Sequence, residues 1–192
     1  MSRKPAFTIS TLVLGAILVA TLSIPALAGE PAPAHVKALA DAKLKAVGTN
    51  ATVVAAVKAA NAAGQSLDQI KARDVEWQKT PGVTAEMKAL MDNACGKYLR
   101  GLQGEMPWLA EAFVMDNQGA NVAMTDKTSD YWQGDEPKWQ ESFKGGTGAV
   151  HVSDVKFDDS AQTYTVQISV PVMDGGKAIG AITFGIDVDK VQ

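Results

Sequence analysis

The chain has 192 residues, of which 46% are hydrophobic and 20% are charged, and its formal net charge is −3. This length and composition are typical of a folded globular chain and exclude a disordered or collagen-like one. The acidic balance without a basic run argues against a nucleic-acid partner. The single Cys excludes an internal disulfide, a multi-Cys zinc site and an iron–sulfur site. No C-x-x-C-H motif is present, which excludes c-type haem, and no cofactor is expected.

Residues 1–28 have the pattern of an export signal peptide. A basic start is followed by a mostly apolar stretch over residues 11–24, and Ala26-Leu27-Ala28 is an A-x-A cleavage motif. The apolar stretch is too short to span a bilayer comfortably, so we expect cleavage rather than a retained anchor. No stable membrane insertion is expected after cleavage, and the predicted location is periplasmic or secreted. Cleavage removes two positive and no negative charges, so the mature chain is more acidic.

Residues 29–82 are predicted to form an Ala-rich helical extension. Apolar residues recur at helical spacing over 36–47, a second helix is expected within 50–64, and Ser66 caps a third, short helix. Two interpretations stay open for this extension. The helices either wrap around their own domain or pack against a partner or a second copy, which leaves a homodimer as an alternative.

Residues 83–192 are predicted to form an α+β domain. Thr84 caps the strongest helical pattern, whose apolar face runs to Leu102 over about five turns and carries Cys95 as a buried thiol. Strands are expected over 109–115, 121–125, 149–157, 162–172 and 177–188, and a short helix is expected over 136–143. The predicted fold is therefore a five-stranded antiparallel sheet with the long helix packed on one face.

The last two predicted strands have one apolar and one polar side. A three-residue turn at Asp174–Gly176 with a glycine bulge places both apolar sets on the same side of the sheet. The polar side then collects Thr165, Gln167 and Ser169 from one strand and Thr183, Gly185 and Asp187 from the other. This side carries no Lys, Glu or Arg, and Gly185 leaves room for an approaching group. The pattern favours the floor of a ligand pocket over a solvent-facing surface, which stays open as the alternative.

The segment 126–139 is predicted to form the roof of this pocket. It interleaves aromatic side chains with carboxylates, which suits a small polar or cationic ligand: Tyr131, Trp132, Trp139, Asp130, Asp135 and Glu136. Structural roles for the same residues, as hydrophobic plugs and turn caps, stay open. The spacing of the carboxylates does not match an EF-hand calcium loop, so no metal site is expected.

The order of these elements resembles a Cache domain, also called a PDC sensor domain, the extracytoplasmic PAS-like sensor module. The resemblance covers roughly residues 84–190 and rests on Met115–Gly119, Ser129–Glu136, Gln167–Val172 and Gly180–Val188. It implies a PAS-like fold with a pocket for small ligands such as amino acids, amines or carboxylates. The chain resembles a stand-alone exported member, because it has no second membrane helix and no signalling domain, and such a member would act with a separate membrane receptor.

The resemblance also implies roles for single residues. The Asp that holds the ligand amine falls on Asp187, and the loop aromatics fall on Trp139 and Trp132. Amino-acid-binding members have Arg and Tyr where this chain has Pro137 and Gln140. Because Arg clamps a carboxylate with its bidentate fork, an amine or an uncharged metabolite fits at least as well as an amino acid. The expected ligand-binding residues are Asp187, Trp139, Trp132, Tyr131, Asp130, Gln167, Thr183 and Thr165.

The expected function is a small-molecule-binding sensor domain that is not an enzyme. The first alternative is an accessory or interaction module of the cell envelope that binds no ligand. The second is a small carboxylate-dependent hydrolase, which is disfavoured because His35 and His151 have no evident Ser/Asp constellation and no G-x-S-x-G motif occurs.

Overall fold

The computed structural model describes residues 29–158 and 163–191, so the predicted signal peptide and most of the predicted turn after residue 157 lie outside the described residues. The helical elements are α1 (Ala34–Leu39), a π-helical turn η1 (Ala40–Leu44), α2 (Lys45–Val47), α3 (Ala51–Ala63), α4 (Leu67–Lys79), α5 (Ala85–Asp92), α6 (Ala94–Glu105), α7 (Pro137–Phe143), and the short turns η2 (Lys144–Gly146) and η3 (Val188–Lys190). The strands are β1 (Leu109–Met115), β2 (Asn121–Met124), β3 (His151–Val152), β4 (Lys156–Asp158), β5 (Thr163–Asp174) and β6 (Lys177–Asp187). Within these ranges no helix combines the length and apolarity needed to cross a lipid bilayer.

The strands form an antiparallel sheet in the order β2-β1-β6-β5-β3, and β4 also pairs with β5. The predicted α+β class with an antiparallel sheet is therefore confirmed. The sheet has six strands rather than five because the predicted strand over 149–157 is divided into β3 and β4, which both pair with β5.

The β5–β6 hairpin has the predicted register. Val170 lies opposite Ile182 and Ile168 lies opposite Phe184, so both apolar sets share one side. The predicted three-residue turn is wrong, because Asp174 pairs with Lys177 and only two glycines of positive φ form the turn. The odd offset instead comes from a bulge next to Val172, inside the hairpin.

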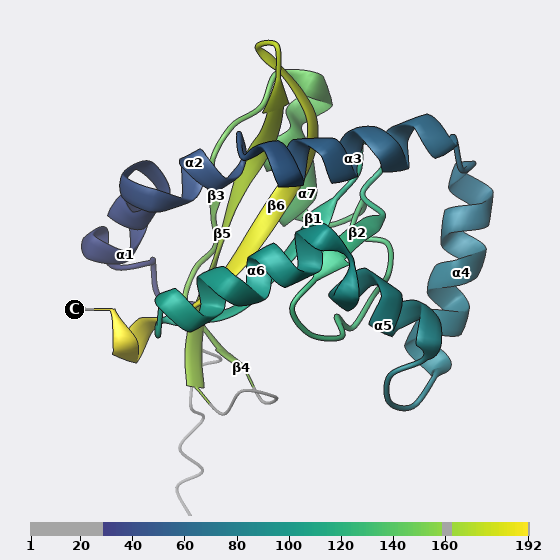
Figure 1. The fold of residues 1–192 in the computed structure, drawn as a ribbon. Coiled ribbons are helices and arrows are strands. Elements are labelled where there is room, and N and C mark those ends of the chain that lie inside the picture. The colour runs from purple at the N-terminus through teal and green to yellow at the C-terminus, as the bar shows by residue number, and fades with distance from the viewer. Residues whose placement is uncertain (1–28, 159–162, 192) are drawn as a thin grey trace, which may run out of the picture.

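Helices from both halves of the chain cover the apolar side of the sheet (Figure 1). Val53 and Val57 of α3 and Leu99 of α6 are fully buried in one core cluster with the apolar residues of β5 and β6. Val36 and Leu44, which precede α3, are fully buried in the same cluster. Residues of the predicted extension and of the predicted sensor domain thus share one core.

The predicted long helix is two helices that meet at Asn93. The ψ angle of Asn93 is 170°, its Oδ1 accepts a hydrogen bond from Gly96 N at 2.8 Å, and its Nδ2 donates to Val122 O of β2 at 2.9 Å. The prediction of one continuous helix is therefore wrong. The N-cap hydrogen bond and the tertiary hydrogen bond together stabilise the break at Asn93 more than a continued helix would be stabilised there.

The helix α4 is longer than the predicted short helix and has thirteen residues. It begins with a capping box between Ser66 and Gln69, as the position of Ser66 predicts. It lies at the far end of α3, beyond β2, where Ile70 and Trp77 are buried against residues of the predicted roof segment (Figure 1).

Candidate functional site

The centre of the polar side of the β5–β6 hairpin is buried beneath α7. Ser169 and Thr183 lie directly opposite each other, both are fully buried, and their hydroxyl oxygens are 2.8 Å apart. Each hydroxyl therefore satisfies the other without a ligand.

The room expected above Gly185 is filled by a neighbouring side chain. Glu111 of β1 lies opposite Gly185, and a Cβ atom at Gly185 would lie only 2.6 Å from Glu111 Cγ. The absence of a side chain at Gly185 thus makes space for Glu111.

A cavity of about 330 Å³ lies at the outer part of this polar side. It is lined by Glu136, Lys138, Ser153, Lys156, Phe157, Thr165 and Gln167. Lys138 Nζ pairs with Glu136 Oε2 at 2.9 Å and lies 5.4 Å from the centre of the Phe113 ring. The cavity brings the predicted floor residues Thr165 and Gln167 together with the start of α7.

Asp187 lies at the end of β6, opposite Thr165, and is 4% exposed. Its Oδ1 accepts hydrogen bonds from Thr163 Oγ1 at 3.1 Å and Asp189 N at 3.2 Å, and its Oδ2 pairs with Lys190 Nζ at 2.9 Å. Burial alone would raise the pKa of Asp187, but the hydrogen bonds from Lys190 and Thr163 outweigh burial and hold this pKa below its ordinary value. Asp187 is therefore a carboxylate at neutral pH, and it already has a cation beside it.

Trp139 is packed into the underside of α7. Its ring stacks on Phe143 with the ring centres 5.0 Å apart, and its Nε1 donates a hydrogen bond to the backbone oxygen of Asp116 at 3.0 Å. The indole N–H thus links α7 to the residue that follows β1 by a hydrogen bond.

The other aromatic residues of the predicted roof lie elsewhere, at the edge of the sheet beside α4. The backbone N–H groups of Tyr131 and Trp132 donate to Asp74 Oδ1 of α4 at 2.7 and 3.0 Å. Trp132 Nε1 donates to Gln118 O at 2.8 Å, and Asp130 O accepts from Asn121 Nδ2 at 3.0 Å. The roof segment is therefore divided between α4 and the sheet face, and the eight expected residues do not gather in one cavity.

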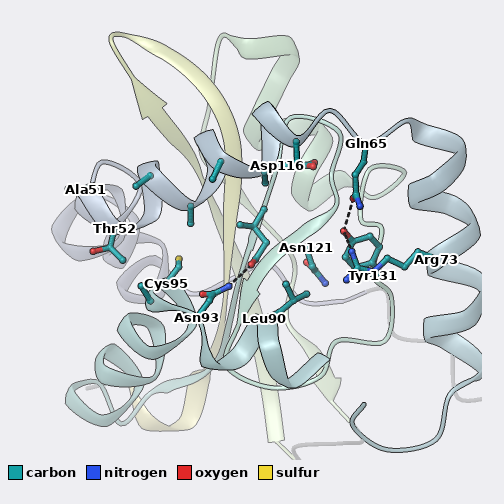
Figure 2. A pocket seen from close by; sticks show the side chains of 17 residues that line it. Ala51, Thr52, Gln65, Arg73, Leu90, Asn93, Cys95, Asp116, Asn121 and Tyr131 are labelled. Atoms are coloured by element: carbon teal, nitrogen blue, oxygen red, sulfur yellow. Dashed lines mark hydrogen bonds between the residues drawn. The ribbon is translucent and has the colours of Figure 1, made fainter. Parts of the chain in front are cut away.

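A larger cavity of about 770 Å³ lies between α3, the α5–α6 pair and the β1–β2 hairpin (Figure 2). Alanines of α3 form one wall, and its lining includes Arg73, Asp116, Asn121 and Tyr131. Of these four, only Tyr131 is an expected site residue. Asp116 lies in the segment Met115–Gly119 that carries the resemblance but has no expected ligand role, and no local pattern distinguishes Arg73 or Asn121.

Arg73 and Tyr131 form the polar corner of this larger cavity. Arg73 Nη1 donates to the Tyr131 hydroxyl at 2.7 Å, and the guanidinium carbon lies 4.0 Å from the centre of the Tyr131 ring. Arg73 Nη2 also pairs with Glu86 of α5. Burial raises the pKa of Tyr131 above its ordinary value, although the Arg73 charge opposes this shift.

Within residues 29–158 and 163–191, no three His, Cys, Asp or Glu side chains gather closely enough to hold a metal ion.

Comparison with known proteins finds one family model that matches the C-terminal part of the chain. Residues 103–192 match the family model of the first PDC sensor domain of methyl-accepting chemotaxis protein-like proteins. The resemblance to Cache (PDC) sensor domains is therefore confirmed for this part. No curated protein matches the chain.

Several solved sensor domains resemble the fold. The ligand-binding domain of the Campylobacter jejuni chemoreceptor Tlp3, in complex with 4-methylisoleucine, is 18% identical, with a TM-score of 0.42 over 73% of this chain and 56% of that chain. The sensor domain of the V. cholerae histidine kinase DctB is 12% identical, with a TM-score of 0.46 over 82% of this chain and 52% of that chain. The ligand-binding domain of the Pseudomonas aeruginosa PAO1 amino acid chemoreceptor PctC, in complex with GABA, is 8% identical, with a TM-score of 0.36 over 75% of this chain and 62% of that chain. The chain thus spans little more than half the length of these structures.

Proposed function

We propose that this chain, whose residues 103–192 match the PDC sensor family, is an exported sensor domain that binds a small polar or amine-bearing metabolite. It acts with a separate receptor in signal transduction and is not an enzyme. The observation that carries the proposal is the cavity of about 330 Å³ where Thr165 and Gln167 meet the start of α7.

The size and lining of this cavity support a small ligand. Ligand pockets in proteins typically enclose roughly 300–1,000 Å³, so this cavity suits a molecule of few heavy atoms. Gln167 offers both a donor and an acceptor. Lys138, whose side chain is 12% exposed, and Glu136 add a cation and a carboxylate that can reorient toward a charged ligand.

Asp187 is not among the residues that line this cavity, but it lies opposite Thr165, which does, and it supports the preference for an amine. The Lys190 side chain that pairs with it is 60% exposed, so water competes for this ammonium group, and holding the long side chain in place costs conformational entropy. A ligand ammonium can therefore replace the Lys190 ammonium while Thr163 and the backbone N–H of Asp189 keep the carboxylate oriented.

The proposal is tested by a thermal-shift screen of amines, amino acids and small carboxylates on the purified protein. A ligand is expected to raise the melting temperature, and Gln167→Ala and Asp187→Asn are expected to reduce that shift. Lys177→Ala, at the exposed tip of the β5–β6 hairpin, is the matched control and should retain the full shift. A hit that stabilises all variants equally would show that the site is wrong, and a screen without any hit would contradict the ligand class.

An exposed aromatic pair favours an accessory, partner-binding role as a second candidate. The Phe157 and Tyr164 rings meet edge to face with centres 5.3 Å apart, and the residues are 49% and 53% exposed. Exposed apolar patches are typical of protein-binding surfaces. Size-exclusion chromatography with light scattering tests self-association through this pair: a dimer that becomes a monomer in Phe157→Ser/Tyr164→Ser supports it, and a monomeric natural protein contradicts it.

A further inference from the structure

The larger cavity, between α3, α5–α6 and the β1–β2 hairpin, has an apolar body and two polar places (Figure 2). Its apolar lining includes the alanines of α3, Leu90 and Val122. Asp116 lies beside α3, whereas Asn121 lies between Leu90 and Tyr131, near Arg73 (Figure 2). The cavity of about 330 Å³ under the proposed function is called the sheet-face site below. None of the residues that line the larger cavity lines the sheet-face site.

Asn121 presents a buried acceptor that the protein leaves unused. The residue is 2% exposed, and its Nδ2 donates to Asp130 O at 3.0 Å and Thr128 Oγ1 at 2.8 Å. Because a carbonyl oxygen only accepts hydrogen bonds, the contact with Asp130 fixes which end of the amide is nitrogen. Asn121 Oδ1 then has no hydrogen-bond partner among the described residues. An unpaired buried acceptor is unfavourable, and a ligand donor would remove that cost.

Arg73 presents an unused donor in the same part of the cavity. Its Nη1 and Nη2 have partners in Tyr131 and Glu86, but the buried Nε has none within the part of the chain that the structure describes. Because the Glu86 carboxylate offsets the guanidinium charge, a neutral ligand group fits beside Arg73 and Asn121 better than a charged one. A hydroxyl or a primary amide can donate to Asn121 Oδ1 and accept from Arg73 Nε, whereas a carboxylate cannot donate and an ammonium cannot accept.

Asp116 places a carboxylate at the other polar place. The residue is 5% exposed, and its Oδ1 accepts from the backbone N–H groups of Gln118 at 2.8 Å and Ala120 at 2.9 Å. No ion pair joins it to a cation in residues 29–158 or 163–191. Burial raises the pKa of Asp116 above its ordinary value despite those N–H contacts. A buried carboxylate without a cation is unfavourable, and an ammonium group beside it would relieve that cost.

We propose that this cavity is a second binding site, which takes a small amphipathic amine with its ammonium group at Asp116 and a hydroxyl or primary amide group at Asn121 and Arg73. The aliphatic chain that joins the two ends lies along the alanines of α3. Amino alcohols and amino amides have all three parts: the ammonium group, the hydroxyl or primary amide group, and the aliphatic chain between them.

Isothermal titration calorimetry with a series of ω-amino alcohols, from aminopropanol to aminohexanol, and with aminopentanamide tests the proposal. Pentylamine, pentanol and aminopentanoate each lack one required group and are the comparison compounds. The best amino alcohol or amide is expected to bind about tenfold tighter than any of these three. No binding by the series, or equal affinity for the comparison compounds, overturns the proposed chemistry.

Variants of the chain locate the binding. Asp116→Asn keeps an oxygen for the two backbone donors and removes the negative charge, so it is expected to weaken binding about tenfold with the fold retained. Ala56→Leu fills the cavity from α3 and should abolish binding, whereas Ala62→Leu, exposed on the same helix and outside the lining, should not change it. Unchanged binding in both cavity variants overturns the site.

The two sites are distinguished by Asp187→Asn, which alters the sheet-face site alone. It is expected to leave amino alcohol affinity unchanged. Loss of amino alcohol binding in Asp187→Asn would place these ligands in the sheet-face site and overturn the second site. Crystal structures without ligand and after soaking with the amino alcohol test whether Asn121 Oδ1 and Arg73 Nε bind the ligand. The proposal is overturned if ordered water is bonded to both atoms and the same water remains after soaking.

Discussion

Asp74 of α4 holds the backbone of Tyr131 in place: its Oδ1 accepts the Tyr131 N–H at 2.7 Å, and the same atom accepts the Trp132 N–H at 3.0 Å. Asp74 is 8% exposed, and its Oδ2 accepts from Gln78 Nε2 at 2.7 Å. One carboxylate therefore joins a helix of the N-terminal half to the polar loop after β2. This contact makes α4 part of the same folded unit as the family-matching region.

Replacing Asp74 by Ala is expected to lower the free energy of unfolding by about 2–4 kcal/mol, because buried donors lose a charged acceptor. Asp74→Asn keeps one acceptor oxygen, so its free energy of unfolding should lie between those of the natural protein and Asp74→Ala. Urea unfolding measures both changes. Glu76→Ala, on an exposed side chain of the same helix, should change the free energy by less than about 0.5 kcal/mol. An Asp74→Ala loss no larger than that of Glu76→Ala would show that the anchor contributes nothing.

The buried hydroxyl pair Ser169–Thr183 makes a second, separate prediction. Thr183→Val and Ser169→Ala each leave one buried hydroxyl without its partner and should cost about 1–2 kcal/mol of unfolding free energy. The double variant leaves no orphan hydroxyl, so its loss should be smaller than the sum by about 1 kcal/mol. Chemical denaturation of the four proteins gives this coupling directly, and strict additivity would mean that the hydroxyls do not depend on each other.

Local patterns were sufficient to predict much of the fold. Alternating apolar residues predicted which side of β5 and β6 faces the core and how the two strands pair, and Ser66 and Thr84 cap helices where the sequence predicts caps. The break at Asn93 was missed because the apolar spacing continues through it, and the oxygen that stabilises the break belongs to Val122, far along the chain.

The candidate site was harder to predict for the same reason. Thr165 and Gln167 share a face because strand alternation requires it, and they do line one cavity. Trp132 and Trp139 are close in sequence but separate in space, since Asp74 holds one and the end of β1 holds the other. The signal peptide, the boundary near residue 82 and the ligand roles of single residues stay predictions.

The dual role of Asn93 can be separated by two substitutions. Asn93→Asp keeps an oxygen that caps α6 but loses the donor to Val122 O, and Asn93→Ala loses both contacts. We expect losses of about 1 kcal/mol for the Asp variant and about 2–3 kcal/mol for the Ala variant. Thermal and urea unfolding measure these losses. Equal losses in the two variants would show that the cap contributes nothing.

Cys95 is expected to be inert in the folded protein. It is 1% exposed, and burial raises the pKa of its thiol to about 12. Because the thiolate is the reactive form, its reaction with Ellman's reagent should be at least about a thousandfold slower than in concentrated urea. Rapid labelling of the native protein would contradict this prediction and would indicate that the α3–α6 region opens readily.

His151 should make stability depend on pH. It lies half-buried on β3 opposite Ser169, and burial lowers its pKa below the ordinary value, although Glu141 of α7 opposes the shift. A histidine with a lowered folded-state pKa favours the folded state fully above its unfolded-state pKa of about 6.5, and this contribution is lost as the pH falls through the folded-state pKa. The melting temperature should therefore fall between about pH 7 and pH 5, and His151→Gln should flatten that slope. His35→Gln, at an exposed residue of α1, is the matched control and should keep the slope of the natural protein. An unchanged slope in His151→Gln would show that other groups cause the pH dependence.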